Sequence, residues 1–206
     1  MMNFWFQDRR IAIPIIFAIT MGILFGHLLG NILLSDESVN VIGKTPTKGI
    51  YLLQSQAFPE EATALYAQAK MREEGFETIV VKEFNHYYLY HAVSTDPNQF
   101  HTIINNFEEK GISYQVKEKM LHRYIEPMKN DPDLIQDVQF YLTTIDYYIQ
   151  LLDGETVNFS EEYVKNLSKT NIDIFHQLYL LHTIHHSPLS DYYELIVYKT
   201  IAEVLM

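Results

Sequence analysis

The hydrophobic positions of this 206-residue chain are concentrated near its beginning. Residues 11–34 read IAIPIIFAITMGILFGHLLGNILL and contain no charged side chain. These 24 residues would form a helix about 36 Å long, which is enough to cross a bilayer core of about 30 Å. The pattern therefore predicts a transmembrane helix at 11–34.

The residues on either side of this segment predict its orientation. Arg9 and Arg10 precede it, and basic residues stay on the cytoplasmic side of a membrane. Residues 1–10 are therefore expected to be a cytoplasmic stub, with the bulk of the chain outside the membrane. A cleaved signal peptide is the alternative, but its apolar core is shorter and ends at a small-x-small site, which this run lacks. Residues 35–47 are polar and predict a linker.

Three glycines follow one another at intervals of four in the apolar segment: Gly22, Gly26 and Gly30. Small residues at this spacing allow two membrane helices to approach closely, which predicts a homodimer through the membrane helix. The alternative is that glycine is simply common in such helices.

Residues 48–118 contain an internal repeat with an offset of 36 residues between Tyr51 and Tyr87. Each half predicts a strand, a helix ended by a glycine (Gly75 or Gly111) and a second strand. In the first half, the predicted helix has an apolar stripe of Ala62, Leu65 and Ala69, and in the second a stripe of Phe100, Ile103, Ile104 and Phe107. Asp96-Pro97 marks the start of the second helix.

Two such halves predict a ferredoxin-like βαββαβ domain, in which both helices cover one face of a four-stranded sheet. Strand alternation then places a set of polar and aromatic side chains on the other, open face. This set is Gln54, Gln56, His86, Tyr88 and Tyr90. The alternative is that Tyr88 and Tyr90 lie beneath helices of the C-terminal part or in a dimer interface.

Residues 119–206 show helical periodicity, with apolar residues spaced by three and four. The pattern predicts three long helices and one short one, which form a small antiparallel bundle. The expected fold class is therefore α+β: a membrane helix, a ferredoxin-like domain and an all-α C-terminal domain. The C-terminal helices either pack on the preceding domain or bind a protein partner that the sequence does not identify.

Composition narrows the function classes. The net charge of −11 makes nucleic acid a poor partner. The chain has no cysteine, which excludes disulfides, thiolate nucleophiles and cysteine-based metal sites.

Histidines are the remaining candidates for chemistry. His182, His185 and His186 are close in sequence, but no HExxH motif accompanies them, and histidine is favourable at helix ends. No GxSxG motif is present, and adjacent carboxylates such as Glu60-Glu61 diverge on a helix. We therefore expect no catalytic residue, no metal site and no cofactor, and a protein that is not an enzyme.

The 48–118 segment resembles a known family. Its run Tyr51-Leu52-Leu53-Gln54-Ser55-Gln56-Ala57-Phe58, followed by Gly75-Phe76 and Gly111-Ile112, is similar to the SPOR (sporulation-related repeat) domain. Gln54 and Phe58 match the family pattern, whereas Gln56 stands at its usual glycine and Ala57 at its small polar residue. The resemblance implies binding of peptidoglycan glycan strands without stem peptides, by a domain that one membrane helix anchors.

The expected function is thus non-catalytic binding of glycan strands, which targets the protein to a division or sporulation septum. The residues 48–118 carry more acidic than basic side chains, so stacking on tyrosines and hydrogen bonds from amides are the expected means of binding a glycan. The alternative function is a protein–protein interaction module of the cell envelope that has lost glycan binding.

Overall fold

The computed structural model describes residues 48–130, 135–165, 167, 171–184, 187 and 189–206, which all lie in the compact unit Pro46–Met206. The predicted cytoplasmic stub, the membrane helix with Gly22, Gly26 and Gly30, and the linker 35–47 lie outside the described residues. Among the helices within the described ranges, none combines the length and the hydropathy needed to cross a bilayer.

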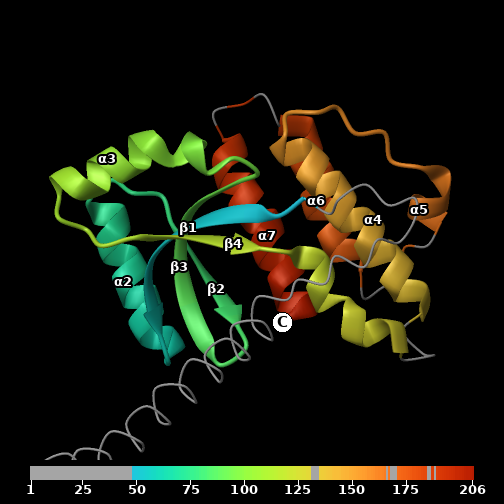
Figure 1. Cartoon of the computed structure of the whole chain (residues 1–206), viewed down its shortest axis with the longest axis horizontal. Helices are drawn as coiled ribbons and strands as arrows, with labels where there is room; N and C mark the ends of the chain where they lie inside the picture. The colour runs from blue at the N-terminus through green and yellow to red at the C-terminus, as the bar shows by residue number, and fades with distance from the viewer. Residues whose placement is uncertain (1–47, 131–134, 166, 168–170, 185–186, 188) are drawn as a thin grey trace, which may run out of the picture. The chain divides into compact units, whose positions relative to one another are not determined.

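The first part of the unit is a four-stranded antiparallel sheet. Its strands are β1 (Ile50–Phe58), β2 (Ile79–Glu83), β3 (His86–Ser94) and β4 (Gln115–Lys119), in the order β2-β3-β1-β4. Helix α2 (Glu61–Glu73) connects β1 to β2, and the 3₁₀-helix η1 (Pro97–Phe100) with α3 (His101–Glu109) connects β3 to β4. This strand order is that of the predicted βαββαβ arrangement, and Figure 1 shows α2 and α3 on the same side of the sheet.

The two halves of the repeat end their helices in the same way. Gly75 and Gly111 have φ angles of +89° and +66°, which glycine adopts without steric cost. The next amide in each half, Phe76 or Ile112, donates to a carbonyl five residues back, at 2.9 and 2.8 Å. This is the hydrogen bond of a Schellman motif. The predicted helix ends are therefore confirmed.

One face of the sheet packs against α2 and α3. The buried side chains of this core are Leu53, Ala64, Met71, Phe76, Val80, Leu89, Phe100 and Phe107. The stripe predicted for α3 is confirmed, since Phe100 and Phe107 are buried. The stripe predicted for α2 is wrong: α2 buries Ala64 and Met71, whereas 47% of Leu65 is exposed. The apolar residues of α2 are not clearly confined to one side of the helix. The sequence therefore does not show which side is buried.

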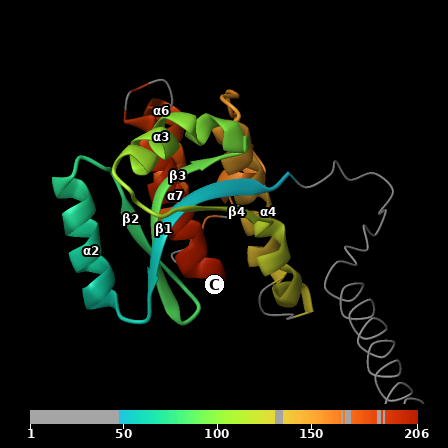
Figure 2. The same cartoon turned by 60° about the vertical axis from the view of Figure 1, so that its left-hand side comes forward.

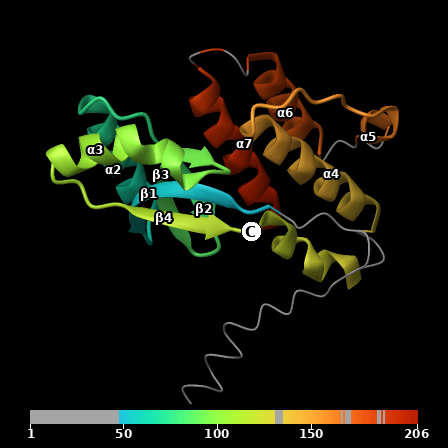
Figure 3. The ribbon, with the colours of Figure 1, turned by 45° about the horizontal axis from the view of Figure 1, so that its top comes forward.

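The C-terminal part contains the four predicted helices. They are α4 (Ile135–Leu152), α5 (Glu161–Lys165), α6 (Ile172–Ile184) and α7 (Ser190–Leu205), preceded by two 3₁₀-helices, η2 (Leu121–Tyr124) and η3 (Glu126–Asn130). Helix α7 packs against β2 and β3 on one side and against α6 on the other. Figures 2 and 3 show α7 against the sheet face that is opposite to α2 and α3.

Sheet and C-terminal helices therefore share a second core. Sheet residues Ile50, Leu52, Ile79, Val81 and Tyr90 are in one cluster with the buried side chains of the C-terminal helices. The expectation of a sheet face open to water is wrong over this area. Of the two alternatives for residues 119–206, packing on the preceding segment is the one that the structure has.

Candidate functional site

The predicted open-face residues fall into two groups, one buried and one accessible. Tyr90 is 0% exposed, because α7 lays the ring of Tyr198 edge-on against it, with ring centroids 5.6 Å apart. Tyr90 is thus on the predicted face, but it is not available to a ligand at the surface. Its burial is the consequence of α7 covering β2 and β3.

A buried carboxylate joins α7 to this part of the sheet. Glu83, at the end of β2, is 4% exposed and accepts hydrogen bonds from the hydroxyls of Tyr90, at 2.9 Å, and Tyr198. The Lys119 ammonium forms an ion pair with the other Glu83 oxygen. Burial, with the Glu83 carboxylate nearby, raises the pKa of both tyrosines, so both phenols stay protonated and donate. We call these four residues the Glu83 cluster.

Gln54 is the second buried member of the predicted set. Within the sheet, Gln54 of β1 pairs with Tyr90 of β3 on one side and with Gln115 of β4 on the other. Its side chain is 5% exposed. Its side-chain oxygen Oε1 is buried and accepts no hydrogen bond from any described residue. A buried acceptor without a donor costs on the order of 1–3 kcal/mol, so this position favours a ligand that brings a donor.

Gln56 does not share a face with Gln54. The pairing of β1 with β3 shifts on both sides of Gln54, so that Gln54 pairs with Tyr90 but Gln56 pairs with Leu89. Cross-strand partners point to the same side of a sheet, and Leu89 is in the core beneath α2 and α3. The prediction that Gln56 shares the open face with Gln54 is therefore wrong, because a bulge reverses the alternation. Ala57 takes the place beside Tyr88.

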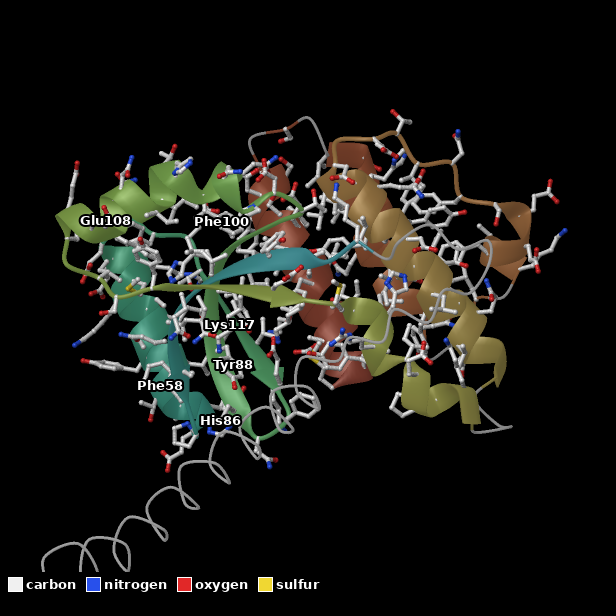
Figure 4. All side chains as sticks on the ribbon, viewed as in Figure 1. Phe58, His86, Tyr88, Phe100, Glu108 and Lys117 are labelled. Atoms are coloured by element: carbon white, nitrogen blue, oxygen red, sulfur yellow. The ribbon has the colours of Figure 1, made fainter. Side chains whose placement is uncertain are left out.

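His86, Tyr88 and Tyr90 form a row along β3, as their equal parity predicts. The ring centroids of His86 and Tyr88 are 6.2 Å apart, and those of Tyr88 and Tyr90 are 6.0 Å apart and stacked. His86 is exposed and Tyr88 is half-buried. The accessible end of the row is thus His86 and Tyr88, which Figure 4 shows toward the β2–β3 turn.

Lys117 belongs to this surface, although the sequence interpretation did not include it. Its ammonium lies 5.3 Å from the centroid of the Tyr88 ring, within the distance of a cation–π contact. Figure 4 shows Lys117 next to Tyr88. The signal in the sequence is that Lys117 and Lys119 are two residues apart on the last strand, which places both on one face. We call His86, Tyr88, Lys117 and Gln54 the Tyr88 site.

His91 lies on the opposite face, as its parity to His86 predicts. The ring packs edge-on against Phe107, and its nitrogens bond Ser55 Oγ at 2.8 Å and the Glu77 carbonyl at 3.2 Å. Burial lowers the pKa of His91 to about 4. His91 therefore stays neutral near pH 7 and packs in the core as an uncharged ring.

The buried His91 and the half-buried Glu194 predict a specific dependence of stability on pH. Below an unfolded-state pKa of 6.5, His91 takes up a proton on unfolding, so it destabilises the fold by on the order of 3 kcal/mol between pH 6.5 and 4. Burial and the nearby Asp191 carboxylate raise the pKa of Glu194 to about 7. The protonated Glu194 side chain therefore contributes to the stability of the fold at acid pH, and this contribution is lost as the pH rises toward 7. As the pH falls, Glu194 thus adds stability while His91 removes it.

Removing Glu194 should therefore expose the effect of His91. We expect the Glu194→Gln variant to lose stability between pH 6.5 and 4 more steeply than the unmodified chain, by on the order of 3 kcal/mol. Urea denaturation at several pH values measures this slope. Glu203→Gln, an exposed change on the same helix, is the matched control. Equal slopes for the two variants would contradict the assignment of these pKa values.

The histidine group considered for a metal is only partly described. His182 is half-buried beside Phe159, with ring centroids 5.5 Å apart, whereas His185 and His186 lie outside the described residues. Within the described part of the chain, no group of three potential ligands is placed to hold a metal ion.

Comparison with known proteins finds a similar solved structure and no matching family model. No family model matches the sequence, and no curated protein matches it. Among solved structures, the chain is similar to the solution structure of the peptidoglycan binding domain of the B. subtilis cell wall lytic enzyme CwlC. The identity is 22%, the TM-score is 0.32, and the match covers 37% of this chain and 96% of that chain. The fold assignment rests on the strand order and pairing.

Proposed function

We propose that this protein binds peptidoglycan glycan strands at the Tyr88 site. The observation that carries the proposal is the buried Gln54 Oε1, which has no donor among the described residues and lies on the same face as the accessible Tyr88 ring. Sugars offer hydroxyl and amide donors together with flat C–H faces that stack on aromatic rings. The sequence resemblance to SPOR domains over 48–118 supports the same ligand class.

Binding at the Tyr88 site is proposed to involve no chemistry on the ligand. The site offers an aromatic face, an amide and an ammonium group, which suit recognition. Incubation of the protein with glycan strands should therefore release no soluble fragments. Fragments that appear with the unmodified chain, and not with a Tyr88→Ala variant, would contradict this part of the proposal.

The binding test uses the full chain in detergent and cell-wall sacculi treated with an amidase to remove stem peptides. We expect Tyr88→Ala to weaken co-sedimentation about tenfold, the effect of an interaction of about 1.4 kcal/mol. Tyr66→Ala is the matched control, because Tyr66 on α2 is 63% exposed and also lies 4.9 Å from a lysine ammonium, that of Lys70. Equal losses in both variants, or none in either, would overturn the proposed site.

Localisation is a further part of the proposal. We propose that the helix predicted at 11–34 anchors the chain, with the unit Pro46–Met206 outside the membrane, and that glycan binding targets it to a division or sporulation septum. A fluorescent fusion of the full chain should then collect at septa. The Tyr88→Ala fusion should instead spread evenly over the membrane. An even distribution of the unmodified fusion would argue against septal targeting.

One observation favours the second candidate function, a protein-interaction module without glycan binding. Helices α5 and α6 expose apolar side chains, namely Val164, Ile172, Tyr179 and Leu180, with exposed fractions of 38–54%. Ile172, Tyr179 and Leu180 are seven and eight residues apart on α6, which places them on one side of that helix, and an exposed apolar helix face is typical of a protein interface. This function would be preferred if the unmodified chain fails to sediment with sacculi at any concentration.

A further inference from the structure

Helix α2 carries apolar side chains on the side that faces away from its own core. Ala62, Leu65 and Ala69, the stripe that the sequence predicts as buried, are all exposed. Their spacing of three and four residues places them on one side of the helix. Tyr66, next to this stripe, is 63% exposed. Figure 2 shows α2 at the edge of the unit, so this apolar side is available to another molecule.

The side chains of α2 follow nearly the same order in both directions along the helix. From Glu61 to Lys70 the sequence reads EATALYAQAK. Up to Leu65 the order is acidic, alanine, polar, alanine, large, and from Tyr66 it is large, alanine, polar, alanine, basic. The sizes are therefore symmetric about the centre of this segment, whereas the charges at its two ends are opposite. Glu73, the last residue of α2, lies beyond the symmetric segment.

This symmetry suits contact with a second copy of the same helix. In a two-fold dimer, a residue of the first chain meets a different residue of the second, and the reverse contact is identical. Two antiparallel α2 helices, centred between Leu65 and Tyr66, place Ala62 of one chain opposite Ala69 of the other. The small alanines allow the two helices to approach closely. The same register brings the acidic end of each helix to the basic end of the other, which is favourable for association.

We propose that two copies of this chain associate through their α2 helices, in antiparallel orientation along the stripe of Ala62, Leu65 and Ala69. The contact covers about 15 Å of helix and is smaller than a standard interface, so the association is reversible. Tyr88 packs toward the second core, on the sheet face opposite to α2, so a dimer of this kind leaves both copies of the Tyr88 site accessible. The inference does not depend on glycan binding.

Cysteine crosslinking tests this register, because the natural chain contains no cysteine. The full chain in detergent, with one introduced cysteine, is oxidised, and gel electrophoresis measures the crosslinked dimer. Leu65→Cys is next to the two-fold axis and should crosslink with its own copy. Ala62→Cys alone and Ala69→Cys alone should not, because each lies about 10 Å along the axis from its own copy, too far for a disulfide. A mixture of these two variants should crosslink.

Thr102→Cys is the matched control, because Thr102 is an exposed residue of α3, the other helix on this side of the sheet. We expect about tenfold more crosslinked dimer from Leu65→Cys, the ratio that a contact of about 1.4 kcal/mol gives. Association through the membrane helix alone would give equal yields for the two variants, and equal yields would overturn the proposal. Crosslinking of Ala62→Cys with its own copy would overturn the antiparallel register.

A second change blocks the stripe without altering the charge of the helix. Ala69→Gln, added to the Leu65→Cys chain, places a long side chain between the two helices and should lower the crosslink to the level of the control. Thr63→Gln, an exposed change on α2 outside the stripe, should leave the crosslink in place, as should Tyr66→Ala. A crosslink that persists unchanged with Ala69→Gln would mean that the two helices do not meet along this stripe.

Discussion

A fragment of residues 46–118 is expected to lose cooperative folding, although it contains all but the last residue of the βαββαβ repeat. Without the C-terminal helices, the sheet would expose Ile50, Leu52, Ile79, Val81 and Tyr90, each at most 3% exposed in the structure. Fully burying one such side chain contributes about 1.5–3 kcal/mol. Five of them contribute on the order of 10 kcal/mol, which equals the whole stability of a typical domain.

The measurement is thermal unfolding by circular dichroism, with binding of a hydrophobic dye to detect an exposed core. Residues 46–206 are the comparison, since they form the compact unit. We expect this longer chain to unfold in one sharp transition and the chain that ends at 118 to bind dye without a transition. A sharp transition in the shorter chain would show that the sheet does not need its C-terminal cover, and would restore 48–118 as an independent domain.

Replacing Lys119 by methionine should produce the second large effect. The ion pair of Lys119 with Glu83 is nearly buried, with side chains 11% and 4% exposed. Removing one partner leaves the other charge buried without compensation, which costs about 3–5 kcal/mol. Urea denaturation of residues 46–206 measures the loss. The double variant Lys119→Met, Glu83→Gln should recover part of it, because the uncompensated charge is gone.

An exposed ion pair provides the control for this change. Lys165 and Glu161 form an i,i+4 pair on α5 whose side chains are 74% and 90% exposed. Such pairs are screened by water and contribute little, so Lys165→Met should leave the urea midpoint unchanged. A loss for Lys119→Met no larger than that for Lys165→Met would mean that water reaches Glu83 and that the cluster does not hold α7 to the sheet.

Local signals in the sequence were sufficient to predict the topology. Glycines at 75 and 111, each following a helical stretch, marked the two helix ends, and Asp96 accepts from the Asn98 amide at 3.0 Å at the predicted start of the second helix. The 36-residue offset then related one half to the other. Strand parity also predicts the correct face for Tyr88 and Tyr90, because alternation holds from His86 to Tyr90, where β3 pairs with β2 without a shift.

The burial of the second sheet face under the C-terminal helices was harder to predict. The sequence nevertheless contains a signal for this burial. Ile79-Val80-Val81 and the run from Ile50 to Leu53 are continuously apolar, which is typical of strands buried on both faces. An open face requires alternation with polar residues, which these strands lack. The last helix has apolar residues at helical spacing, and Leu195, Tyr198 and Ala202 are all buried. Pairing this apolar side of the helix with the apolar face of the sheet predicts the second core.

The bulge at Gln54–Gln56 and the Glu83 cluster could not be predicted in the same way. A bulge adds one residue to one strand, and no residue type is required at Ser55 or Gln56 for this to happen. Glu83 looks like an ordinary charged residue before a turn. Glu83 becomes a buried acceptor because Tyr198 and Lys119 contact it in the fold. These residues are 115 and 36 positions away from it in the sequence.

The separation between Glu83 and Tyr198 also bears on the order of events during synthesis. These two side chains are 115 positions apart and meet in the core. When the ribosome has released the complete repeat, one side of its sheet still has nothing to pack against, and it must wait for the helix 190–205. Contacts between distant parts of a chain also slow folding. The nascent chain therefore passes through a period in which an apolar sheet surface is unprotected, and a chaperone that shields such surfaces would act in that interval.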